Sequence, residues 1–238
     1  MKRGNLWLPV ILLLVVLGVL SVRGRFFARS DRGVAVQHGA TRLPDPRLHS
    51  EISVEEAIFR RRSIRRYRDE PLTLEEVSQL LWAACGKTID GITGATRAYP
   101  SAGGLYPLEI YVVAGNVQGL HAGIYHFGWA EHSIKLLRAG DARQELTRAA
   151  FGQRMVAQAP LSLVFTAVYE RTTRRYGQRG EDRYVPMDVG GAGQNVHLQA
   201  EALGLGTVII GAFQDGAVKE VLDLRDEEPL YIMPVGRP

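Results

Sequence analysis

This sequence contains almost no cysteine. It also lacks the residue spacings of metal sites and the glycine motifs that bind nucleotides. Cys85 is the single cysteine among 238 residues, which excludes an intrachain disulfide framework, a cysteine-rich zinc site and a cysteine-ligated iron–sulfur cluster within one chain. The six histidines form neither H-E-x-x-H nor a comparable spacing, so we expect ordinary loop and surface histidines and no metal site. No window matches G-x-G-x-x-G, a P-loop or G-x-S-x-G, which argues against Rossmann, P-loop and α/β-hydrolase chemistry.

Most of the chain also has a net charge close to zero. The formal net charge is +4, but residues 1–32 hold six basic side chains and one acidic one, so the remaining 206 residues carry a net charge of −1. A domain that binds nucleic acid needs a basic face, and we therefore expect no nucleic-acid partner. Hydrophobic residues make up 46% of the chain and charged residues 23%, which is typical of a globular protein.

The N-terminus contains a long uncharged run. Residues 4–22 lack any charged side chain, and 19 helical residues span roughly 28 Å, close to the thickness of the hydrocarbon core of a bilayer. A cleaved signal peptide is the alternative, because Lys2 and Arg3 would form its basic region, but no small-x-small cleavage site follows. We expect a membrane anchor through residues 6–22, with basic residues on both sides that only slightly favour a cytoplasmic domain.

The rest of the chain divides into a linker and one domain. Residues 23–48 contain several glycines and prolines without a sustained period and are predicted to be a linker, while residues 49–238 alternate helical and strand patterns, which predicts a single α+β domain. Capping boxes begin helices at Ser53 and Thr73, and Asp141 is a third helix cap. The expected helices cover 53–62, 73–86, 141–151, 188–203 and 214–222, and the expected strands cover 109–114, 123–127, 133–137, 161–169, 207–210 and 230–235.

Three segments are candidates for chemistry, and the first is rich in arginine. Residues 60–68 hold six arginines around Ser63 at the end of a predicted helix. Guanidinium groups match phosphate oxygens, and a serine hydroxyl adds a donor. A solvated, positively charged helix end explains the same pattern without a ligand.

The other two segments are rich in glycine. Residues 99–110 place small residues between prolines, which lets the backbone approach a flat ligand or simply makes a tight turn before a strand. Residues 186–195 place glycines at the predicted start of a helix, where free N–H groups would face an electron-rich ligand atom. Close packing of this helix on a sheet is the alternative.

Together these segments resemble the FMN-dependent nitroreductase superfamily. The motifs are R-R-S-x-R at 61–65, P-S-A-G-G-L-Y-P-L-E at 100–109, D-x-G-G-x-x-Q-N at 188–195, A-L-G-L-G-T at 202–207, G-A-F at 211–213 and P-V-G-R-P at 234–238. The branch they resemble most is that of the SagB/ThcOx-like dehydrogenases. The resemblance implies a central mixed or antiparallel sheet flanked by helices, a homodimer with FMN in the subunit interface, and NADH or NADPH as electron donor.

The resemblance also implies roles for particular residues. The phosphate of FMN would be held by Arg61, Arg62, Ser63 and Arg65, with Gly206 and Thr207 along the ribityl–phosphate side and Arg237 completing the phosphate site. The flavin of the other subunit would be reached by Pro100, Ser101, Ala102 and Gly104. The edge of the isoalloxazine ring would lie along Asp188, Val189, Gly190 and Gly191, with a backbone N–H near N5.

The implied reaction is ping-pong hydride transfer at flavin N5 with a small-molecule substrate. Azoline-oxidising members carry a Lys-Tyr pair where this chain has Arg175-Tyr176, and some carry a His at the position of Gly191. Tyr176 is a candidate proton donor or substrate contact; otherwise it is a tyrosine in the charged loop 170–183. The alternatives are a membrane-tethered flavin-binding protein without turnover, a structural membrane protein without a ligand, and a reductive dehalogenase of the iodotyrosine deiodinase kind.

Overall fold

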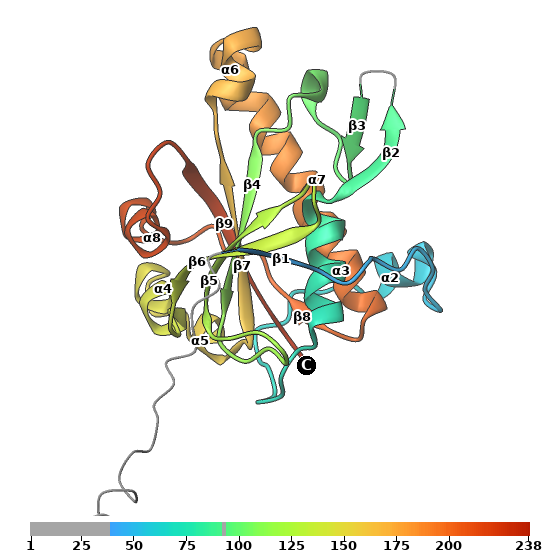
Figure 1. Ribbon diagram of the computed structural model, residues 1–238, viewed down its shortest axis with the longest axis vertical. Coiled ribbons are helices and arrows are strands. Elements are labelled where there is room, and N and C mark those ends of the chain that lie inside the picture. The colour runs from blue at the N-terminus through green and yellow to red at the C-terminus, as the bar shows by residue number, and fades with distance from the viewer. Residues whose placement is uncertain (1–38, 92–93) are drawn as a thin grey trace, which may run out of the picture. The chain divides into compact units, whose positions relative to one another are not determined.

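The computed structural model describes residues 39–91 and 94–238, and its centre is an antiparallel sheet (Figure 1). The strand order is β1-β6-β5-β4-β7-β9-β8, and every neighbouring pair is antiparallel. The predicted central strand is confirmed, because β7 pairs with β4 on one side and β9 on the other. The strands are β1 (Ala40–Arg42), β4 (Leu108–Ala114), β5 (Gly123–Gly128), β6 (Ser133–Ala139), β7 (Leu161–Ala167), β8 (Gly206–Thr207) and β9 (Glu228–Gly236).

Helices cover both faces of the sheet (Figure 1). Successive side chains of β4 point to opposite faces, so Leu108 and Ile110 pack with α3 and α7, while Tyr111 and Val113 pack with α4, α5 and α8. All seven residues of β4 and of β7 are buried, which explains why their sequences are continuous apolar runs. The helices are α2 (Val54–Arg60), α3 (Leu74–Cys85), α4 (Arg143–Ala149), α5 (Arg154–Gln158), α6 (Glu170–Tyr176), α7 (Val185–Ala202) and α8 (Asp215–Leu222).

The three predicted helix caps have different outcomes. The capping box of α3 is confirmed: the Thr73 N–H donates to Glu76 Oε2 at 2.8 Å, and the Glu76 N–H donates to Thr73 Oγ1 at 3.2 Å. At α2 only half of the box forms, because Ser53 accepts from a backbone N–H while the Glu56 carboxylate pairs with Arg60. At α4 the N-cap residue is Ala142, but Asp141 still accepts from a free N–H of the helix, because the Arg143 N–H donates to Asp141 Oδ1 at 3.0 Å. The same carboxylate binds the Arg143 guanidinium.

Two elements differ from the predictions in ways that matter for the site. Helix α7 begins at Val185, and a π turn over Gly180–Tyr184 leads directly into it. Gly190 and Gly191 therefore lie inside the helix, and the expectation of free N–H groups at a helix N-terminus is wrong. The predicted charged loop 170–183 is also wrong, because α6 and the π turn occupy it.

Further elements were not predicted. A hairpin of β2 (Lys87–Gly91) and β3 (Gly94–Arg97) follows α3. The predicted linker overlaps the sheet, because β1 pairs with β6 and the next residue, Leu43, is buried in the core. Within residues 39–91 and 94–238, no helix combines the length and the apolar character that crossing a bilayer requires. The predicted anchor at residues 6–22 lies outside the described residues and stays a prediction.

Gly190→Ala and Gly193→Ala should have opposite effects on stability, although both positions lie inside α7. A methyl at position 190 meets open space, so helix propensity raises the free energy of unfolding by about 0.5–1 kcal/mol. A methyl at position 193 overlaps the Tyr231 hydroxyl, and this crowding costs about 1–3 kcal/mol. Urea denaturation of the two variants measures both effects. Equal stabilisation by both would contradict the packing of α7 on β9.

Candidate functional site

The second and third candidate segments meet at a buried hydrogen bond. The Ser101 hydroxyl donates to Asp188 Oδ2 at 2.5 Å and also accepts from the Tyr106 N–H at 2.9 Å. Only 4% of Asp188 is exposed, and burial raises the pKa of its carboxyl, opposed by the hydrogen bonds from Ser101 and the Ala102 backbone. Residues 87 positions apart in the sequence therefore form one unit within a single chain. The resemblance assigns residues 100–104 to the flavin of the other subunit, and that role stays a prediction.

The turn after Ser101 depends on glycine. Gly103 and Gly104 both adopt a φ of 65°, the left-handed conformation that glycine tolerates best. A Cβ on Gly103 would lie 2.7 Å from Tyr176 Oη and 3.1 Å from a guanidinium nitrogen of Arg175, so this glycine also makes room for α6. On the other side of the turn, a Cβ on Gly191 would meet the Pro100 ring at 3.5 Å. The turn is enclosed between α6 and α7.

Helix α6 is fixed to the sheet by an ion pair between the half-buried Arg171 and a buried carboxylate. Arg171 lies 2.6 Å from Glu109, and the other oxygen of this carboxylate lies 2.9 Å from His126 Nε2. Arg171 also donates to the Tyr106 carbonyl at 3.3 Å, which connects α6 to the glycine turn. Burial opposes ionisation of Glu109, but its bonds to His126 and Arg171 outweigh burial and lower the pKa of the carboxyl. Tyr176, five residues after Arg171 on the same helix, is thereby held beside the turn.

The arginine segment lies at the other end of α7, beside β8. Ser63 forms a bridge with Thr207, and the Ile64 N–H donates to the Thr207 carbonyl at 2.9 Å. A Cβ on Gly206 would come within 2.7 Å of the Ile64 side chain, so only glycine allows this approach. Thr207 is buried, and its hydroxyl donates to the Pro234 carbonyl at 2.9 Å. The first segment and the A-L-G-L-G-T motif are thus brought together.

Several cations of this segment have no acid beside them. Arg60 pairs with Glu56 and Arg68 lies 3.9 Å from Glu70. In the part of the chain that the structure describes, the other four arginines have no ion-pair partner: Arg61, Arg62, Arg65 and Arg66. An unpaired cluster of this kind is available to an anionic ligand.

Arg237 forms ion pairs that the sequence did not indicate. Its guanidinium lies 2.9 Å from Glu76 and 3.5 Å from Glu70, so two carboxylates oppose its charge. Its carbonyl accepts from the Arg68 N–H at 2.9 Å. These contacts connect the end of the chain to the capping box of α3 and to the arginine segment. The predicted contact of Arg237 with a phosphate stays a prediction.

Sequence reasoning missed one histidine at this end. His197 on α7 is 4% exposed, so the expectation of a loop or surface histidine is wrong here. Burial, together with the charge of Arg61, lowers the pKa of His197 to about 4. The ring is therefore neutral at pH 7 beside the cationic segment. Its position on the buried face of a helix was the available signal, four residues after Gly193.

Sequence reasoning also missed a buried arginine beneath the glycine turn. Arg97 donates to the Leu108 carbonyl at 3.1 Å and contacts Cys85 Sγ at 3.3 Å, and it lies over the rings of Trp129 and Tyr106. Cys85 is buried in the core, and burial raises the pKa of its thiol to about 11 despite this arginine. The thiol is not set up as a nucleophile.

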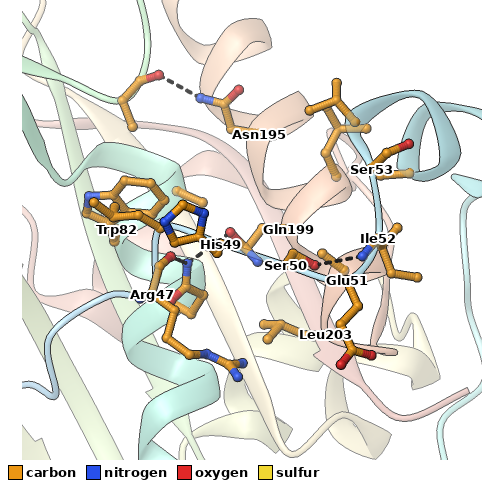
Figure 2. A pocket seen from close by; sticks show the side chains of 18 residues that line it. Arg47, His49, Ser50, Glu51, Ile52, Ser53, Trp82, Asn195, Gln199 and Leu203 are labelled. Atoms are coloured by element: carbon orange, nitrogen blue, oxygen red, sulfur yellow. Dashed lines mark hydrogen bonds between the residues drawn. The ribbon is translucent and has the colours of Figure 1, made fainter.

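A pocket of about 990 Å³ lies between residues 47–54, α3 and α7 (Figure 2). Trp82 lines it from α3, and Asn195, Gln199 and Leu203 line it from one face of α7 or its end. The side-chain amides that line the pocket already form hydrogen bonds within the protein. Asn195 donates to the Ala98 carbonyl at 2.8 Å, and Gln79 donates to Gln199 at 3.1 Å. No motif in the sequence indicated this pocket.

His197→Gln should flatten the pH dependence of stability. The unfolded chain, in which the pKa of this histidine is near 6.5, binds more protons than the folded protein between about pH 4 and 6.5. The contribution of the neutral ring to stability is therefore complete above this window and is lost as the pH falls through it. Urea denaturation at pH 7.5 and 4.5 should show a steeper loss for the wild type than for the variant. His121→Gln, at an exposed position, is the control, and a variant that parallels the wild type would contradict the assignment.

The chain matches the model of the nitroreductase family over residues 58–237. MJ1384 of Methanocaldococcus jannaschii, whose name assigns it provisionally to the nitroreductases, is 47% identical over 195 residues, covering 82% of this chain and 94% of MJ1384. The microcin B17-processing protein McbC of Escherichia coli is 27% identical over 173 residues, covering 69% of this chain and 62% of McbC.

A solved structure from Ralstonia eutropha, also named provisionally as a nitroreductase, has a TM-score of 0.71 and 30% identity, and the match covers 83% of this chain and 89% of that one. The agreement in fold therefore covers most of both chains. Together with the family match and the agreement of the motif segments in space, this similarity is decisive for the family. The chain belongs to the nitroreductase family and has its α+β fold.

Proposed function

We propose that this protein is an FMN-dependent oxidoreductase that exchanges a hydride by a ping-pong mechanism between NADH or NADPH and a small-molecule substrate. The observation that carries the proposal is that four of the motifs meet in pairs, one pair near each end of α7. Ser101 bonds to Asp188 at one end of α7, and Ser63 pairs with Thr207 beside the other. Asp188 and His197 are separated by roughly 13 Å of helix rise. A ligand that spans both ends must be elongated, with a flat part and an anionic part, as FMN is.

The cationic end fits the phosphate of FMN. Arg61, Arg62 and Arg65 have no ion-pair partner among the described residues, and the exposed Ser63 adds a hydroxyl donor. Gly206 permits the close approach of this segment to β8. The buried Thr207 contributes through its backbone, because its hydroxyl is already bonded to Pro234. We assign Arg237 a supporting role here, since Glu76 and Glu70 balance its charge.

The other end fits a flat ring. Gly190 is exposed and has open space where a side chain would be, and the turn from Pro100 to Gly104 stands beside it through the contact with Gly191. The N–H groups of these glycines lie within the helical ladder. Their contribution is therefore a surface free of side chains along which the ring edge fits, with Asp188 and Val189 buried behind it.

Bound FMN would supply N5, the ring atom that takes up and returns the hydride. The residues of this chain would orient the substrate over the ring and exclude water from it. The Tyr176 Oη, held beside Gly103, would contact the substrate or donate a proton to it. Membership of the SagB/ThcOx-like branch is part of the proposal, and the likeness to McbC supports it. Azoline-oxidising members carry a lysine where this chain has Arg175, so we expect a substrate other than an azoline.

A homodimer with FMN in the interface is also part of the proposal. Large apolar side chains of α2 face solvent, and Phe59 is 89% exposed. Val54 and Ile58 on the same helix are also exposed, as is Leu48 beside the pocket of Figure 2. Apolar surface of this kind is typical of a protein–protein contact. A second copy on α2 and α7 would cover both this surface and the pocket.

Arg62→Gln should weaken the binding of FMN by about tenfold or more, because a charge-assisted hydrogen bond to phosphate contributes about 1.5–3 kcal/mol. The affinity for riboflavin, which lacks the phosphate, should not change. Fluorescence titration of the apoprotein with each flavin measures both affinities. Arg66→Gln, at an exposed position outside the predicted phosphate site, is the control. An equal loss for FMN and riboflavin would remove Arg62 from the phosphate site.

Phe59→Asp should convert the dimer to a monomer and reduce the amount of bound flavin, because it places a charge in the proposed apolar contact. Phe151→Asp is the matched control: it introduces the same charge at an exposed phenylalanine beside α4, away from α2 and α7. Sedimentation of both variants gives the masses. A dimer that survives Phe59→Asp with its flavin would refute this interface.

A further inference from the structure

Helix α6 and the π turn after it are rich in arginine, and most of these side chains already have a polar partner. Arg171 pairs with Glu109, Arg174 lies 2.7 Å from Glu170, and Arg179 donates to the Tyr184 hydroxyl at 2.9 Å. Across residues 39–91 and 94–238, Arg175 and Arg183 have neither an ion-pair partner nor a side-chain hydrogen bond. Of these two, Arg175 is the one that touches the candidate site, through Gly103.

The guanidinium of Arg175 is held in place without being neutralised. Its central carbon lies 5.4 Å from the centre of the Tyr176 ring, and one of its nitrogens lies 3.1 Å from the point where a Gly103 Cβ would be. The Tyr176 ring in turn packs edge-on against Tyr184 at 4.8 Å between ring centres. Since Arg171 anchors α6 to the sheet, the position of Arg175 is fixed from two sides.

We infer that Arg175 selects substrates that carry a carboxylate or another compact anion next to the group that reacts. This inference rests on the proposed function, because it places the substrate over the ring beside the glycine turn. A planar guanidinium that an aromatic ring already contacts loses less conformational freedom when it binds a carboxylate with two parallel hydrogen bonds. Asp188, across the turn, is buried and bonded to Ser101, and it forms no ion pair with Arg175 among the described residues.

A purely structural role for Arg175 makes a different prediction. If its only task were to pack on Tyr176, a neutral replacement would alter stability but would affect charged and uncharged substrates alike. The relevant readout is therefore a ratio between two ligands of the same shape that differ in charge. Benzoate and benzamide are such a pair for binding, and 4-nitrobenzoate and 4-nitrobenzamide are the corresponding pair for reaction.

The first experiment measures binding to the oxidised, FMN-loaded full-length protein. Benzoate and benzamide are titrated separately, and the change in the visible flavin spectrum or the heat of binding gives each Kd. We expect the wild type to bind benzoate about tenfold more tightly than benzamide, a difference of about 1.4 kcal/mol. Arg175→Gln should remove this preference and Arg175→Lys should retain part of it. High salt should weaken the preference of the wild type.

The second experiment measures reaction in a single turnover. Protein reduced with dithionite is mixed with 4-nitrobenzoate or 4-nitrobenzamide. The nitro group takes two electrons and two protons from the reduced flavin, which becomes oxidised, and yields the nitroso compound and water. The ratio of the two reoxidation rates should fall about tenfold in Arg175→Gln. Arg174→Gln is the matched control, because it removes the same charge one residue away, where Glu170 already balances it.

The outcomes separate this inference from the proposed function. A protein that binds no FMN would overturn the proposed function and the inference with it. A protein that binds FMN and reduces both nitro compounds without a preference for the anion would overturn the inference alone. Equal losses of the preference in Arg174→Gln and Arg175→Gln would also overturn it, because they would show a general effect of charge rather than a contact with Arg175.

Discussion

The hydrogen bond between Ser101 and Asp188 is the contact on which the candidate site depends. Its carboxylate is buried while its serine is partly exposed, and it joins the turn before β4 to the first part of α7. A buried carboxylate without a cation beside it is stable only where donors surround it, and the Ser101 hydroxyl and the Ala102 backbone provide these donors. The turn must therefore keep one conformation, which the two left-handed glycines after it make possible. The left-handed conformation of the turn and the bond from Ser101 to Asp188 thus depend on each other.

Helix α7 connects the glycine turn at one end of the site to the arginine segment at the other. Its glycines allow close contact with neighbours: Gly193 lies against Tyr231 of β9, while Gly190 leaves an open surface. Further along the helix, His197 is buried beside the Arg61 charge. One rigid element therefore sets the separation between the turn and the cationic segment. A ligand bound to both would be positioned by the sheet itself, because α7 rests on it.

Features set by local chemistry could be predicted from the sequence. The capping box at Thr73 and the apolar runs of β4 and β7 were correctly located, because short-range bonding and burial fix them. Features set by tertiary contacts were missed. Helix α6 has a sequence that looks like a charged loop, and its anchor is the pair of Arg171 with Glu109, 62 positions earlier in the chain. At Asp141 the sequence predicted the bond to a helix N–H, but not the ion pair of the same carboxylate with the Arg143 side chain.

The candidate site shows the same division. The motif segments were identified one by one, but neither the bond between Ser101 and Asp188 within one chain nor the ion pairs of Arg237 were visible in the sequence.

The central claim is that the two ends of α7 hold FMN. The most direct test is the visible absorption spectrum of the purified full-length protein, with identification of the released chromophore. The account predicts about one FMN per chain. A colourless protein that remains colourless after incubation with FMN would contradict it, and the arginine segment would then be a solvated helix end.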